Sequence, residues 1–136
     1  MKKNLFRIAL AGVLFAGLSF LSTTNQVHAQ NNTLVDNLYN PPTGSFVTPA
    51  VALVRLEQAM APLKLIMEAY SGGGPQYDQA FRKYSYFDAI SNAISEGKTV
   101  PVSIVDGLKA VETDAYSVPR KTLYEYKQEA INLLRL

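Results

Sequence analysis

The sequence predicts an all-α fold, a small antiparallel bundle of three main helices plus a short one. Apolar residues recur at helical spacing over long stretches, proline and glycine stand where helices would begin and end, and no two segments alternate as paired strands do. The expected divisions are a cleaved secretory signal peptide (1–29), an extended or flexible arm (30–47) and a helical domain (48–136).

The first 29 residues predict export. A positively charged start is followed by an apolar run over 8–21, and Ala29 supplies the small residue before an expected cleavage at Gln30. A membrane anchor is the alternative, but the run has 14 residues whereas a span needs about 20. We therefore expect a periplasmic or secreted product with no stable membrane span after cleavage. The positive charges of this segment are Lys2, Lys3 and Arg7.

Those three cations would leave with the signal peptide, which changes the charge of the product. The chain has 13 Lys and Arg against 11 Asp and Glu, so ten cations would remain and the net charge would be −1. Nucleic-acid binding depends on clustered cations that contact phosphates. A near-neutral chain without a basic block predicts no nucleic-acid partner.

Composition also argues against an enzyme. The chain has no cysteine, and its one histidine, His28, lies in the predicted signal peptide. The product would lack disulfides, thiolate ligands and the imidazole used by most general bases near neutral pH. The acids at 78, 88, 112 and 114 match no metal or catalytic pattern, and the pair Ser95 and Lys98 lacks the companion motifs of Ser-Lys hydrolases. We expect no catalytic residues, cofactor or metal.

The first helix is predicted to begin at Thr48, whose hydroxyl can cap it, with Pro49 at the first helical position. Pro62 interrupts the pattern and predicts either a simple bend or a hinge beside a ligand. The glycine-rich stretch 71–75 ends the helix as a turn and lacks the residues of a phosphate-binding loop. The inner stripe is Leu53, Leu56, Met60, Leu63, Met67 and Tyr70.

The second helix is predicted from Pro75 to Glu96, with Gly97 as its left-handed cap. Its stripe leaves Tyr86 outside, although the surrounding stretch 77–88 is the most aromatic part of the helical domain. The stripe residues are Tyr77, Phe81, Tyr84, Phe87, Ile90 and Ile94.

The segment after Gly97 allows two interpretations. Thr99 can cap a short helix that Gly107 would end or interrupt, or residues 99–105 can form a strand, for which a pairing partner is missing. The last helix is predicted from Ser117, a capping residue, with Pro119 in its first turn. Its inner face is Leu123, Tyr126, Ala130 and Leu133 or Leu134.

Two functions fit this pattern. One is a protein-binding or structural module of the cell envelope or secreted fraction, in which Tyr86 and Tyr124, both off the predicted stripes, contact another protein or a second copy. The alternative is a carrier of a small apolar ligand in a pocket between helices. The expected pocket residues are Met60, Met67, Phe81 and Tyr84.

Overall fold

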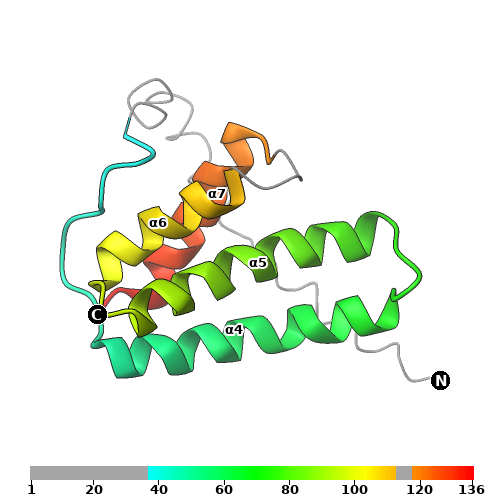
Figure 1. Cartoon of the computed structure of the whole chain (residues 1–136), viewed down its shortest axis with the longest axis horizontal. Helices are drawn as coiled ribbons and strands as arrows, with labels where there is room; N and C mark the ends of the chain where they lie inside the picture. Colours follow the sequence, from blue (N-terminus) through cyan, green and yellow to red (C-terminus); the bar gives the residue numbers. More distant parts are fainter. Residues whose placement is uncertain (1–36, 113–117) are drawn as a thin grey trace. The chain divides into compact units, whose positions relative to one another are not determined.

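The computed structural model describes residues 37–112 and 118–136, which belong to the unit Val35–Leu136. The predicted signal peptide, its cleavage site and Asp114 lie outside these residues. The described part contains four helices and no strand, which confirms the all-helical prediction. The helices are α4 (Pro49–Ala69), α5 (Pro75–Ser95), α6 (Val100–Glu112) and α7 (Arg120–Leu134) (Figure 1).

Helix α4 begins where the sequence predicts. The Thr48 hydroxyl oxygen accepts a hydrogen bond from the Val51 amide at 3.3 Å, and Pro49 occupies the first turn. This arrangement satisfies one amide that has no partner within the helix. The helix continues through Pro62, whose side chain is exposed, and ends at Ala69 before the glycine-rich turn.

Helix α5 follows that turn and runs back beside α4, so the two form a helical hairpin (Figure 1). It ends at Ser95, and Gly97 has a φ of 98°. This left-handed conformation costs glycine little, and the Gly97 amide donates to the Ile94 carbonyl oxygen at 2.9 Å. The predicted cap is confirmed.

Helix α6 decides between the two interpretations of its segment, and the short helix capped by Thr99 is confirmed. The strand over 99–105 is wrong, because a helix runs from Val100 to Glu112 with Thr99 accepting from the Val102 amide at 3.3 Å. The early end at Gly107 is also wrong. Gly107 is buried inside the helix, and a Cβ there would lie 2.9 Å from both Ile90 Cγ1 and Tyr86 Cε1. It is the close approach of α5 that requires glycine at this position.

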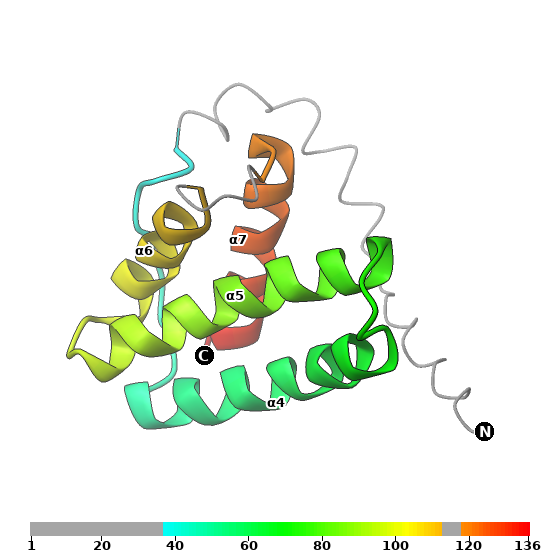
Figure 2. The ribbon, with the colours of Figure 1, turned by 45° about the vertical axis from the view of Figure 1, so that its right-hand side comes forward.

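Helix α7 begins at Arg120, and Pro119 takes the capping position without a side-chain bond. The predicted cap, Ser117, lies outside the described residues. Figure 2 shows α7 running steeply across α5. An ion pair joins the two helices, with Lys83 Nζ 3.0 Å from Glu129 Oε2.

Residues 37–47 are irregular, as the sequence suggests, but they pack closely against the helices. Leu38 and Val47 are buried in the core. The Val47 amide donates to the Leu134 carbonyl oxygen at 2.9 Å, which pairs this segment with the end of α7. The buried Lys127 ammonium donates to the carbonyl oxygens of Asn37 and Asn40, both at 2.9 Å. These residues are therefore irregular but packed on the helices.

The core lies at one end of the α4–α5 hairpin. Helices α6 and α7 cover this end, and α4 and α5 continue beyond them (Figures 1 and 2). The buried residues of α4 are all in its first 12 positions: Ala52, Leu56 and Met60. Most buried residues of α5 are in its second half: Ala80, Tyr86, Phe87, Ile90, Ala93 and Ile94. The hairpin thus has an enclosed half and an open half.

Candidate functional site

Tyr86, predicted as a partner contact, lies at the centre of the core. Its side chain is 0% exposed, and its hydroxyl donates to the Ile104 carbonyl oxygen at 3.1 Å. Its ring lies 5.7 Å from that of Tyr126, and burial raises its pKa well above the ordinary value. The predicted surface role of Tyr86 is wrong. Helix α5 packs against both α4 and α6. Tyr86 lies off the predicted stripe because it faces α6.

Tyr124, the second predicted contact, is half-buried on α7 and packs against the core. Burial raises the pKa of its hydroxyl. Part of the ring remains accessible, so a role in partner binding stays a prediction.

The predicted pocket residues divide between the two halves of the hairpin. Met60 is buried in the core cluster, and Tyr84 packs at its margin with the Lys64 ammonium 5.9 Å from its ring centre. Met67 and Phe81 are half-buried in the open half. The pocket expected between these four residues stays a prediction.

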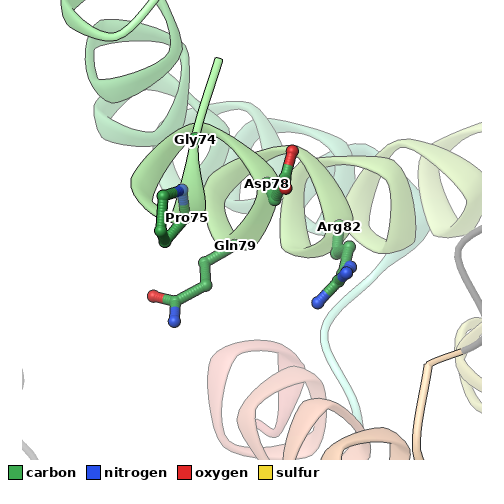
Figure 3. A pocket seen from close by; sticks show the side chains of 5 residues that line it. All are labelled: Gly74, Pro75, Asp78, Gln79 and Arg82. Carbon is green, nitrogen blue, oxygen red and sulfur yellow. The ribbon is translucent and has the colours of Figure 1, made fainter.

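A shallow hollow of about 330 Å³ lies at the start of α5, and none of the predicted pocket residues lines it. Gln79 and Arg82 project from one side of the helix, and Asp78 projects from the other (Figure 3). This open site at the surface has none of the enclosed apolar wall that a carrier pocket needs. The complete lining is Gly74, Pro75, Asp78, Gln79 and Arg82.

The strongest candidate surface is the open half of the hairpin. The apolar stripes of both helices continue here at spacings of three and four residues. Tyr70 is 44% exposed, and the Tyr77 and Phe81 rings stack with their centres 6.0 Å apart. None of these side chains belongs to the core cluster of the described residues. We call this surface the hairpin end: Ile66, Met67, Tyr70, Tyr77 and Phe81.

A second apolar surface lies on the opposite face of α4, and the sequence analysis missed it. Six large hydrophobic residues are exposed in the described part of the chain, and four of them belong to α4 or its C-cap. The spacing of Val51, Val54 and Leu65 was a usable signal. It was overlooked because the inner stripe already accounts for the helix. Val51, Val54 and Leu65 form this surface, whereas the fourth residue, Tyr70, belongs to the hairpin end.

The described residues hold no cluster of acids or histidines that could bind a metal ion, and none of their helices has the length and apolar character of a membrane span. Lys98 donates to Asp106 Oδ2 at 2.7 Å, and this contact raises its pKa. Comparisons of the chain with protein families, curated proteins and solved structures found no match.

Proposed function

We propose that this chain is an exported protein-binding module and that the hairpin end is its binding surface. One observation supports this most directly. The apolar stripes of α4 and α5 continue past the core, so Met67 and Phe81 remain half-buried where a third element would complete their burial. Apolar side chains that are only partly covered gain free energy when a partner covers them.

The residue types of the hairpin end suit protein recognition. Tyrosine, phenylalanine and methionine are enriched at the centres of protein interfaces, because they bury a large area and, for tyrosine, keep a polar tip. The α4–α5 core fixes one end of both helices, so little ordering would oppose binding. A partner helix laid across the hairpin end is the expected mode, with contacts at helical spacing.

The export part of the proposal rests on the charged start, the short apolar run and Ala29. It is tested by expression in the native host and intact mass measurement of the protein from each cell fraction. A product that begins at Gln30 in the envelope or medium is expected. A full-length product that stays in the cytoplasm would contradict this part alone.

The binding surface is tested by capture from envelope and secreted fractions. The variant Met67→Ser/Tyr70→Ser should lose a protein partner that the unchanged chain retains, and its urea unfolding midpoint should stay nearly unchanged because both side chains lie outside the core. Val102→Ser, at an equally accessible apolar position on α6, is the matched control and should retain the partner.

Three outcomes would contradict the assignment. A partner kept by the hairpin-end variant but lost with Tyr124→Ser would move the site to α7. A co-purified apolar small molecule with no protein would favour a carrier. The absence of any specific partner would reject the binding function.

A further inference from the structure

The outward face of α4 has the pattern of a helix that pairs with another helix. Its exposed residues recur at spacings of 3, 4, 3, 4 and 3, which places them in one narrow stripe. Val54 is 54% exposed and Leu65 is 65% exposed, although both are good core residues. We call this face the outer stripe: Val51, Val54, Gln58, Ala61, Leu65 and Glu68.

Helix α4 is well placed for such pairing. In both views it lies at one edge of the helical domain, with α5, α6 and α7 together on its other side (Figures 1 and 2). Its 21 residues give an edge about 30 Å long. Pro62 lies beside the outer stripe rather than within it.

We propose that a second copy of this chain docks on the outer stripe, with the two α4 helices antiparallel about a two-fold axis. In an antiparallel pair with this spacing, the first position of each repeat meets the fourth position of its partner. Val54 then lies against Leu65 of the partner subunit, and Gln58 against Ala61 of the partner subunit. The symmetry repeats each contact, so the face is complementary to itself.

The charges beside the stripe select this register. Glu57 and Lys64 are seven residues apart and both are exposed on the same flank of the stripe. In the proposed register Glu57 meets Lys64 of the partner subunit, and the symmetry gives a second such pair. Sliding the partner by one heptad in either direction brings two Glu57 side chains or two Lys64 side chains together. A parallel pair would instead place the two Glu68 carboxylates face to face.

The other nearby cation does not compete for Glu57. Arg55 donates through Nη1 to the carbonyl oxygens of Leu133 at 2.9 Å and Arg135 at 3.3 Å, so the end of α7 holds it. Lys64 lies over the Tyr84 ring but remains exposed, and its ammonium keeps its donors for a partner carboxylate. The proposed ion pairs can therefore form without the loss of any contact within the monomer.

A single helix pair is a small interface, so we expect a weak dimer with a dissociation constant on the order of micromolar or higher. The outer stripe and the hairpin end are different surfaces. The dimer is therefore independent of the proposed partner binding, and Met67→Ser/Tyr70→Ser should leave it intact.

Sedimentation equilibrium of the purified chain, in the processed form that the host produces, tests the dimer. E57K and K64E should each raise its dissociation constant roughly tenfold, because two attractive pairs become repulsive. The double variant E57K/K64E should restore wild-type affinity, and an equal mixture of the two single variants should form a heterodimer in preference to either homodimer. A monomer at all concentrations, or single variants with unchanged affinity, would overturn the proposal.

Cysteine cross-linking tests the register separately, since the chain has no cysteine of its own. Under mild oxidation the double variant V54C/L65C should form a disulfide-linked dimer rapidly. V54C or L65C alone should cross-link at least about tenfold more slowly, because neither position faces itself and disulfide formation requires close Cα atoms. Rapid cross-linking of a single variant would overturn the antiparallel register.

Discussion

The enclosed and open halves of the α4–α5 hairpin are built from the same two helices and similar side chains, yet they differ in packing. In the enclosed half, α6 and α7 cover the apolar stripes and leave residues such as Leu56 and Ile90 with no exposed surface. In the open half the same stripes continue through Met67 and Phe81 with two helices only. Apolar periodicity therefore predicts which face of a helix is inward, but not where along the helix the covering elements end.

Met60 and Met67 lie on one stripe, seven residues apart, and their replacement should give the largest difference in the free energy of unfolding. Met60→Ala should lower the free energy of unfolding by about 2–4 kcal/mol, because it leaves a cavity in a packed core. Met67→Ala should lower it by less than about 1 kcal/mol, because Met67 is only half-buried. Urea denaturation of both variants measures the difference. Equal losses would mean that the hairpin end is as closed as the core.

A smaller difference is expected between Gly107, in the helix that covers the enclosed half, and Gly72, in the hairpin turn. Gly107→Ala brings a Cβ within 2.9 Å of Tyr86 and Ile90, both fully buried. We expect a net loss of about 1–2 kcal/mol, because overpacking outweighs the better helix propensity of alanine. Gly72→Ala is the matched control in the hairpin turn. No atom lies within 4 Å of its added Cβ, and its unfolding free energy should change by less than about 0.5 kcal/mol. An equal loss at both glycines would reject the close packing of α6 on α5.

Local signals in the sequence were sufficient for much of the fold. The Thr48 cap and the left-handed Gly97 depend on neighbouring residues, and both were predictable. The position of Tyr86 depends on which two helices flank α5, and the interpretation of Gly107 depends on the same packing. A single apolar stripe assigned to each helix cannot predict that a second face of the same helix is also buried.

The polar contacts of residues 37–47 were beyond such reasoning for a different reason. Irregular backbone has no periodicity, and its main polar contact joins Lys127 to Asn37, 90 positions away in the chain. Only the fold brings a lysine beside two carbonyl oxygens that need a donor. The hairpin end was partly predictable, since Met67 and Phe81 were singled out from the sequence. The open surface was instead interpreted as a closed pocket.

The enclosed half is also tested by the free energy of unfolding at alkaline pH. Burial raises the pKa of Tyr126 from 10.0 to about 12, so the folded state holds this proton more tightly than the unfolded state. The stabilisation is complete below pH 10 and is lost as the pH rises toward 12. Lys127 acts in the opposite direction, because burial lowers its pKa and stability then rises with pH.

Tyr126→Phe removes the ionisable hydroxyl and keeps the ring. Over this pH range its free energy of unfolding should fall by about 2 kcal/mol less than that of the unchanged chain. Tyr86 and Tyr39 would still contribute, since burial raises both pKa values and Glu112 adds to the shift of Tyr39, so the variant should flatten the profile only in part. Tyr77→Phe in the hairpin end is the matched control for loss of a phenolic hydroxyl. If both variants followed the unchanged profile, Tyr126 would be as accessible to water as a surface tyrosine, and the core would not close around it.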